Sequence, residues 1–494
     1  MKKIITTVCA VTAMSVWAKI EMGAPFVDGV ILQRDHAVPV WGNADAGKKV
    51  TVEFAGNSAS AIAGQDGKWM VKLPAMKASK ESRVMTVVAG DEKLSINDVL
   101  VGEVWMCAGQ SNTECPVWGI NPRYRDGQGA TVILMVNKPH VRFVNVPRAA
   151  AVSPVNNLKT KWVKMTPELF KDCEKRVELP SAMGYYFALE LVNALDIPIA
   201  VVDASWGGTN IDTWTPRSGY DGMDSLKDVA SLPVLNEKDF GVSRKEGVYK
   251  GKGVYGGWVQ QPTALWNAMV AAYTPMACRG LIWYQGCHNS RESERYCDKM
   301  HALYKGWSKE FANPDLKLYF VQLAPFRDNW MGLVEAQNKF AAEEKNAAIV
   351  VSSDVGNFYD VHPNDKRTIG RRLAFQALAR DYGFDWIKPD SPTFKSAVFS
   401  PCKVEMTFNN ADGWYIWATD RNCNPPFEIA GEDGKWHSAK LLNVKDGGTI
   451  VGTTLTLTNS AVAKPVKVRY MGQPKTSGTL FNNYALPLGP FTSK

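Results

Sequence analysis

Four short clusters of polar residues carry most of the side chains that suit catalysis, at residues 109–112, 205–210, 285–289 and 354–363. The first three each follow directly on an apolar, β-prone run. In open α/β sheets, ligands and catalytic groups collect at the carboxyl ends of the strands. If the strands are parallel, all four clusters meet at one edge of the sheet.

The first cluster contains the candidate nucleophile, Ser111, in the stretch VGEVWMCAGQSNTECP. A serine hydroxyl is a weak nucleophile, so acyl transfer also requires an adjacent base, and imidazole titrates near the working pH. The alternative for Ser111 is an ordinary helix N-cap, because serine is preferred at that position. The other clusters favour the catalytic interpretation.

The base must come from six histidines, which are His36, His140, His288, His301, His362 and His437. His36 and His437 lie in β-rich flanks, His301 lies inside a predicted helix, and His140 lies in a predicted loop. Of the remaining two, we favour His362, because Asp360 and Asp354 are close to it in the sequence. A carboxylate there would hold the imidazole in the correct tautomer and stabilise the cation that forms.

An oxyanion also needs hydrogen-bond donors, and the second and third clusters supply candidates. Gly207 and Gly208 allow the backbone to approach a ligand closely, and Gln285 and Asn289 are the candidate side-chain amides.

Cys287 next to His288 is an alternative nucleophile, because thiolates form readily beside imidazolium.

The composition excludes some classes of function. The net charge of +8 is modest for 494 residues, and the 57 basic residues form no run, so no nucleic-acid footprint is indicated.

Residues 1–18 predict a signal peptide. They have a basic start and a short apolar segment, and Ala18 is a small residue at the expected cleavage site. We expect export to the periplasm, with the medium as the alternative. No later segment is apolar and long enough to predict a membrane span.

The pattern of elements predicts three domains after the signal peptide. Short strands and turns over residues 19–97 predict a β-sandwich. Strands alternate with helices over residues 98–390, which predicts an α/β domain whose mostly parallel sheet is covered by helices on both faces. The helices are expected at 181–195, 293–312, 333–344 and 365–382. Short strand-like runs recur over residues 391–494 and predict a third, β-rich domain.

Ordered blocks of the chain resemble a known family. VGEVWMCAGQSN, SWGGTNIDTW, IWYQGCHNS and DVHPNDKRTIGRRLA resemble the sialate O-acetylesterase-like family of bacterial carbohydrate esterases, which belong to the SGNH-type serine hydrolases. PFVDGVILQRDHAVPVWGNADAGKKVTV resembles the family's N-terminal sandwich. PFEIAGEDGKWHSAKL and VKVRYM resemble its C-terminal β region.

The resemblance implies removal of O-acetyl groups from sugars, such as acetylated sialic acid or xylan, without a cofactor or a metal. It implies Ser111 as nucleophile, His362 as general base and Asp360 as the acid that orients it. The oxyanion hole would then combine the Ser111 amide, a Gly207 or Gly208 amide and an amide side chain, Gln285 or Asn289. The residues expected to contact the substrate are Gln110, Asn112, Trp206 and His288.

The chain departs from the family pattern at three places. Cys287 and His288 stand where relatives usually have Glu and Ser, and Thr113 and Cys115 stand where relatives have Met. Asp360 precedes the histidine by two residues rather than three, so Asp354 stays a reserve candidate. These departures keep open an alternative function, a glycan-binding protein on an esterase scaffold.

Overall fold

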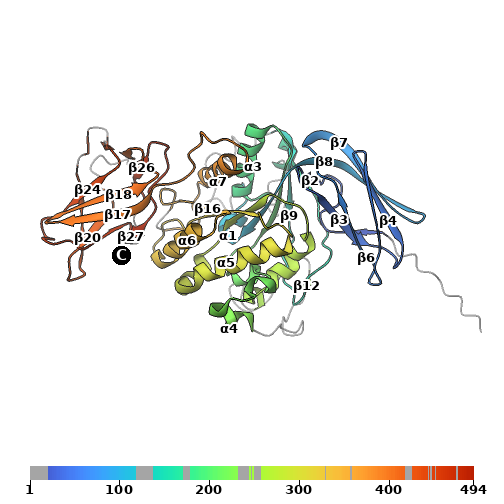
Figure 1. Ribbon diagram of the computed structural model, residues 1–494, viewed down its shortest axis with the longest axis horizontal. Coiled ribbons are helices and arrows are strands. Elements are labelled where there is room, and N and C mark those ends of the chain that lie inside the picture. The colour runs from blue at the N-terminus through green and yellow to red at the C-terminus, as the bar shows by residue number, and fades with distance from the viewer. Residues whose placement is uncertain are drawn as a thin grey trace, which may run out of the picture.

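The structure is a computed structural model that describes residues 20–117, 137–170, 179–231, 244–245, 248–249, 258–328, 330–356, 359–417, 425–442, 444–445, 448–450, 452–473 and 477–493. The predicted signal peptide lies outside this part. Figure 1 shows an elongated molecule, with the N-terminal strands at one end, a middle region of helices and sheet, and the C-terminal strands at the other end. The fold is mixed α/β, with one large mixed sheet and additional β-rich sheets.

The middle region is built on a sheet with the strand order β10-β9-β11-β8-β14-β15-β16. The strands are β8 (Glu92–Gly109), β9 (Lys138–Asn145), β10 (Val163–Met165), β11 (Ile199–Ser205), β14 (Gly280–Tyr284), β15 (Lys317–Val321) and β16 (Ala347–Val350). All neighbours pair in parallel except β10, which pairs antiparallel with β9. The mostly parallel sheet predicted from the sequence is therefore confirmed.

Four long helices cover this sheet, and they fall where the apolar spacing predicts them. They are α3 (Ala182–Leu195), α5 (Ser293–Glu310), α6 (Met331–Glu343) and α7 (Lys366–Asp381). Ser181 caps α3, and Asp365 caps α7 by accepting from the amide of Thr368. The pair α3 and α7 and the pair α5 and α6 lie on opposite sides of the sheet (Figure 1).

The segment between β11 and β14 contains only short elements in its described part. They are the 3-10 turns η4 (Asp212–Trp214), η5 (Arg217–Tyr220), η6 (Asp224–Leu226), η8 (Trp258–Gln260) and η10 (Ala271–Tyr273), helix α4 (Lys227–Ala230), the π-helical turn η9 (Trp266–Val270), and the antiparallel pair β12 (Arg244–Lys245) and β13 (Val248–Tyr249). The sequence predicts a long excursion here, and much of it lies outside the described residues.

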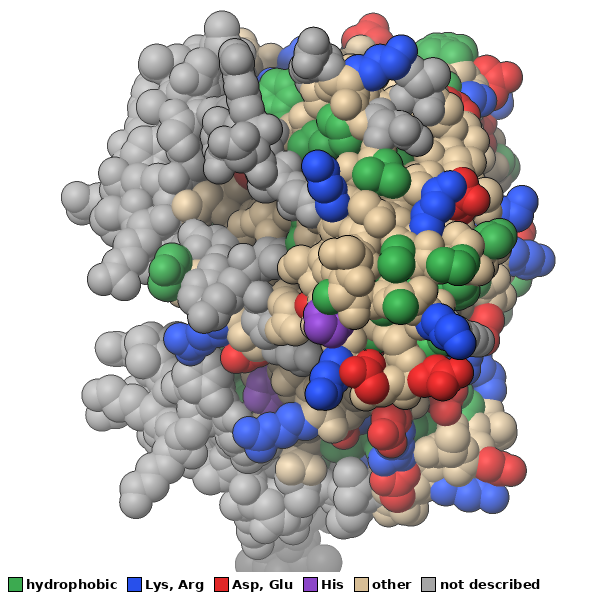
Figure 2. All heavy atoms as spheres, turned by 90° about the vertical axis from the view of Figure 1, so that its left-hand side faces the viewer, with side chains coloured by type: hydrophobic (Ala, Val, Ile, Leu, Met, Phe, Trp, Pro, Cys, Tyr) green, Lys and Arg blue, Asp and Glu red, His purple; other side chains and the backbone are tan. Residues whose placement is uncertain are grey.

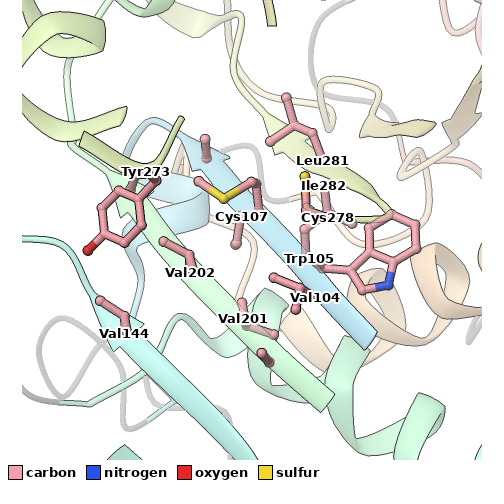
Figure 3. Close-up of a cluster of buried hydrophobic side chains, with 14 of the residues drawn as sticks. Val104, Trp105, Cys107, Val144, Val201, Val202, Tyr273, Cys278, Leu281 and Ile282 are labelled. Atoms are coloured by element: carbon pink, nitrogen blue, oxygen red, sulfur yellow. The ribbon is translucent and has the colours of Figure 1, made fainter. Parts of the chain in front are cut away.

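The core of the middle region lies between the strands and the helices. Apolar side chains of β8, β9, β11 and β14 pack together, and Figure 3 shows Trp105, Cys107, Val201 and Ile282 within this cluster. Strands that are buried on both faces read as continuous apolar runs. This explains why the first three polar clusters each follow such a run in the sequence.

Strand β8 joins the N-terminal strands to the middle sheet. It has 18 residues, and its first part pairs with β7 (Ser79–Ala89) and β2 (Ile31–Gln33), whereas its second part pairs with β11 and β14. The other N-terminal strands are β1 (Glu21–Met22), β3 (Val38–Asn43), β4 (Lys49–Phe54), β5 (Asn57–Ile62) and β6 (Lys68–Leu73). The predicted boundary between residues 97 and 98 therefore falls inside one continuous strand.

A buried carboxylate also ties the two regions together. Glu103 of β8 is fully buried and pairs with Arg34 at 2.5 Å and with Arg279 at 3.2 Å. Gln33 donates a further hydrogen bond of 3.0 Å to the same carboxylate. A buried charge requires such partners, because its desolvation is costly. The N-terminal strands and the base of β14 thus share one buried ion cluster.

The C-terminal strands form three sheets around a hydrophobic core of their own. The strands are β17 (Thr393–Ser400), β18 (Lys403–Asn409), β19 (Trp414–Ile416), β20 (Phe427–Ala430), β21 (Trp436–Ser438), β22 (Lys440–Leu441), β23 (Thr449–Ile450), β24 (Leu455–Thr458), β25 (Lys467–Tyr470), β26 (Leu480–Asn482) and β27 (Phe491–Thr492). Acidic and basic side chains are interspersed on the face of the molecule that Figure 2 shows.

Ser353 joins the C-terminal region to the middle sheet. Its hydroxyl donates to the carbonyl of Leu488 at 3.0 Å, and its carbonyl accepts from the amide of Gly478 at 2.8 Å.

Within the described part of the chain, none of the helices combines the length and the apolar character that crossing a membrane requires.

Candidate active site

Ser111 begins the short helix α1 (Ser111–Glu114) directly after the carboxyl end of β8. The chain turns sharply at Gly109, whose φ is +140°, a conformation that side chains rarely adopt. A Cβ on Gly109 would lie 2.4 Å from the carbonyl oxygen of Tyr284 and 2.5 Å from the hydroxyl oxygen of Thr113. The glycine therefore lets the chain turn close to β14 and places Ser111 at the edge of the sheet.

The imidazole of His362 lies directly against this serine. The distance from His362 Nε2 to Ser111 Oγ is 2.8 Å, and the distance from His362 Nδ1 to Asp360 Oδ1 is 3.3 Å. The same Asp360 oxygen accepts a hydrogen bond of 2.9 Å from the backbone amide of His362. The structure thus brings together the predicted hydroxyl, imidazole and carboxylate in the order that activation of a serine requires.

A buried lysine lies near the histidine. Lys366 Nζ donates a hydrogen bond of 2.5 Å to Oδ1 of Asn112, and it lies over the ring of Tyr284. Burial lowers the pKa of Lys366 to about 8. Burial also lowers the pKa of His362, and the charge of Lys366 lowers it further, whereas Asp360 opposes both effects. The imidazole is therefore held in its neutral form, which a general base needs.

Asn112 was expected to contact substrate, but its side chain is buried and used inside the protein. It accepts the hydrogen bond of Lys366 and donates one of 3.0 Å to the carbonyl of Val361. Val361 lies between Asp360 and His362 in the sequence. Asn112 therefore links the segment that holds the serine to the segment that holds the histidine.

The turn at residues 205–210 also lies against the serine. A Cβ on Gly207 would lie 3.1 Å from Cβ of Ser111. The Gly207 amide, one of the two expected oxyanion donors from this turn, donates a hydrogen bond of 2.7 Å to Oε2 of Glu114. The other oxygen of Glu114 pairs with Arg148. Gly208 has a φ of +73°, and its carbonyl accepts from the side chain of Gln260 at 2.6 Å.

The predicted amide side chains form a buried internal network. Nε2 of Gln285 donates to the carbonyl of Thr209 at 3.0 Å and to Oδ1 of Asn289 at 2.8 Å. Nδ2 of Asn289 donates to Glu292 at 2.7 Å. Both side chains are fully buried. Their amide groups thus hold the third cluster against the second.

Gln110 is likewise buried and directed inward. Its Oε1 accepts from the backbone amides of Gly286 at 3.1 Å and His288 at 3.5 Å. Trp206 is buried too, and its backbone amide donates to the carbonyl of Gly109 at 3.1 Å. Of the four residues expected to bind substrate, His288 is exposed, and Gln110, Asn112 and Trp206 are buried.

The alternative nucleophile and the reserve acid have different surroundings from Ser111 and Asp360. Burial raises the pKa of the Cys287 thiol to about 12, so the reactive thiolate is disfavoured. Both oxygens of Asp354 pair with the guanidinium of Arg372 at 2.8 Å. The geometry therefore favours Ser111 over Cys287 and Asp360 over Asp354.

Sequence reasoning missed Glu114 and Lys366. Both lie close to the catalytic candidates in the sequence, Glu114 three residues after Ser111 and Lys366 four residues after His362. Ser111 and Glu114 share the short helix α1, whereas His362 lies before the first residue of α7. The spacing alone reveals neither the contact of Glu114 with Gly207 nor the burial of Lys366.

Comparisons with known proteins identify similar esterases. The family described as "Carbohydrate esterase, sialic acid-specific acetylesterase" matches residues 246–379. The sialate O-acetylesterase of Rattus norvegicus is 26% identical over 525 aligned positions, which cover 95% of this chain and 94% of the relative. The sialate O-acetylesterase of Homo sapiens is 26% identical over 399 positions, which cover 72% of this chain and 69% of the relative.

A solved structure is similar over the full length. A carbohydrate acetylesterase from Xanthomonas citri superposes with a TM-score of 0.80 at 29% identity, and the match covers 96% of this chain and 99% of that one. Together with the site geometry, these matches define this chain as an esterase. Its sequence and fold resemble those of sialate O-acetylesterases and carbohydrate acetylesterases. The resemblance predicted from the sequence is confirmed.

Proposed function

We propose that this protein is an exported carbohydrate O-acetylesterase that hydrolyses acetyl esters of sugars through an acyl-enzyme. The observation that carries the proposal is the 2.8 Å distance between Ser111 Oγ and His362 Nε2, with Asp360 at the far nitrogen of the ring. The relatives named above are sialate and carbohydrate acetylesterases, which supports an O-acetylated sugar as substrate.

In the first half of the reaction, Ser111 Oγ attacks the acetyl carbonyl carbon while His362 Nε2 takes the hydroxyl proton. The tetrahedral intermediate collapses, the bond to the sugar oxygen breaks, and His362 gives its proton to the departing sugar alcohol. Asp360 stabilises the imidazolium that exists between these two proton transfers. The serine then carries the acetyl group.

In the second half, water attacks the acetyl-serine and His362 takes a proton from it. Collapse of the second intermediate releases acetate and returns the proton to Ser111. The reaction needs no electron transfer, and the SGNH-type mechanism proposed here uses only side chains and backbone amides of this chain.

For the oxyanion, we assign the amides of Ser111 and Gly208. The first amides of a helix have no partner within the helix, and Ser111 is the first residue of α1. The amide of Gly207 already donates to Glu114, so Gly208 is the remaining candidate from its turn. A lost oxyanion donor costs roughly 3–4 kcal/mol of transition-state stabilisation.

The test is acetate release by the mature protein and by Ser111→Ala. The substrates are a small acetyl ester, acetylated xylan and acetylated sialic acid. Release that disappears in the variant supports the serine mechanism, and the preferred substrate identifies the sugar. Equal rates in both proteins would remove Ser111 from the mechanism. No release from any substrate would favour the glycan-binding alternative.

Export is tested separately. The proposal expects the protein in the periplasmic fraction with a mature N-terminus after Ala18, determined by N-terminal sequencing. Retention of residues 1–18 in a cytoplasmic protein would contradict it.

A further inference from the structure

A cysteine, a histidine and a glutamate converge on the outer helices, in a group that the esterase mechanism does not use. Cys297 and His301 lie one turn apart on α5, and Glu343 is the last residue of α6. Oε2 of Glu343 lies 3.4 Å from Sγ of Cys297 and 3.0 Å from Nε2 of His301. All three ligand atoms lie within 4.8 Å of one another, and this is the one such group found among the described residues.

We propose that Cys297, His301 and Glu343 bind a Zn²⁺ ion that joins the end of α6 to α5. Thiolate, imidazole and carboxylate are the three ligand types that zinc takes from proteins, at about 2.0–2.3 Å. Atoms around a tetrahedral ion at such distances are separated by roughly 3–4 Å, so only small side-chain shifts are needed. A water molecule completes the four ligands on the exposed side, where Glu343 lies.

Binding of an ion would change the protonation of Cys297, and a neighbouring ring holds His301 in place. A divalent cation replaces the thiol proton of Cys297, so binding should release one proton to solvent. The Phe340 ring packs edge-on against His301 at 4.8 Å between ring centroids and limits its rotation.

The second oxygen of Glu343 has a partner of its own. Lys339 Nζ lies 3.8 Å from Oε1, whereas Oε2 faces the sulfur and the imidazole. Outer partners of this kind orient ligating carboxylates. Glu343 is therefore arranged to offer one oxygen to the ion and the other to the lysine.

The site is structural in this proposal, because it fixes α6 relative to α5. Helix α6 carries Gln337, whose side chain accepts from the amide of Leu323 and donates to the carbonyl of Gln285. An ion at the end of α6 thus stabilises the helix that supports the third cluster. The chemistry at Ser111 does not pass through it.

The test uses the full chain, freed of metal by a chelator and kept reduced by a phosphine. We expect one equivalent of Zn²⁺ to bind and raise the melting temperature, and Co²⁺ to give a near-ultraviolet thiolate-to-cobalt absorption band. Cys297→Ser should remove the band and weaken zinc binding by more than about 100-fold, which exceeds the typical effect of losing an outer partner. His301→Ala should also weaken binding.

Cys402→Ser is the matched control, because Cys402 is another free cysteine and lies in the turn between β17 and β18, in the C-terminal region. It should keep the band and the affinity. Circular dichroism shows whether each variant is folded. Equal zinc stoichiometry and an equal cobalt spectrum in wild type and Cys297→Ser would overturn the proposal. So would the absence of any zinc binding by the wild-type protein.

Discussion

The carboxylate of Glu114 accepts a hydrogen bond of 2.7 Å from the backbone amide of Gly207, directly beside the candidate nucleophile. A Cβ at Gly207 would lie 3.1 Å from Cβ of Ser111, so this bond fixes the position of the turn relative to the serine. Glu114 is therefore a positioning residue, and its carboxylate holds the Gly207–Gly208 turn in place.

The first prediction concerns this contact. Glu114→Ala should lower kcat on the order of 10- to 100-fold with a smaller change in KM, because a displaced donor costs transition-state stabilisation. Glu114→Gln keeps an oxygen that accepts from Gly207, so it should restore part of the rate. Steady-state kinetics on a small acetyl ester measures both variants. A faster Glu114→Ala enzyme would instead mean that the carboxylate blocks an oxyanion donor.

The second prediction concerns pH. The pKa of His362 lies below its ordinary value, through burial and the charge of Lys366, so the neutral base persists to pH values below about 6.5. Lys366→Met removes the charge, and the pKa of His362 should rise. The acid limb of kcat/KM should then move to higher pH. If the variant loses rate equally at every pH, Lys366 acts only through packing.

The third prediction separates the two candidate acids. Asp360→Asn should lower kcat by about 10⁴-fold, as expected when an imidazole loses its orienting carboxylate. Asp354→Asn should leave kcat within about a factor of ten and lower the melting temperature, because Asp354 pairs with Arg372 through both oxygens. Kinetics and thermal unfolding of both variants give the comparison. The reverse pattern would transfer the orienting role to Asp354.

The fourth prediction concerns Cys287. The Cys287→Ala variant should retain acetate release within about a factor of ten, because burial raises the thiol pKa to about 12 and leaves little thiolate. Thiol-directed alkylation of the wild-type protein, followed by an assay, provides an independent measurement. Complete loss of activity in Cys287→Ala, with an unchanged circular dichroism spectrum, would reopen the cysteine mechanism.

The fifth prediction concerns stability. Burial raises the pKa of Asp203 to about 7, from an ordinary value near 3.8. Between these values the folded protein binds more protons than the unfolded chain, so the free energy of unfolding should fall as the pH rises from about 4 to 7. Asp203→Asn should remove that part of the pH dependence. Urea unfolding across this pH range measures it, and parallel curves for the two proteins would contradict the assignment.

The sequence predicted the scaffold well because buried parallel strands and amphipathic helices leave strong patterns. The strands β8, β11 and β14 end at Gly109, Ser205 and Tyr284, within a residue or two of the ends of the apolar runs. The direction of a side-chain amide leaves no such pattern. Gln110, Gln285 and Asn289 were expected to face substrate, and the structure uses all three to hold its own loops together.

Charges that act through another residue were also not predictable from the pattern. Lys366 resembles any other basic residue at a helix start, and only the fold shows that it is buried and that its charge acts on His362. Glu114 is similar, since its partner Gly207 is 93 residues away in the chain. Distant partners of this kind become visible only when the strands are assembled.

Because β8 is one continuous strand, it limits where the chain can be divided into expression fragments. The same backbone that pairs with β7 near Glu92 ends at Gly109, just before the nucleophile. An expression fragment that begins at residue 98 would cut a strand rather than a linker and would leave Glu103 without Arg34. The N-terminal strands thus hold the central strand of the catalytic sheet in place. A change that loosens them should alter the position of Ser111.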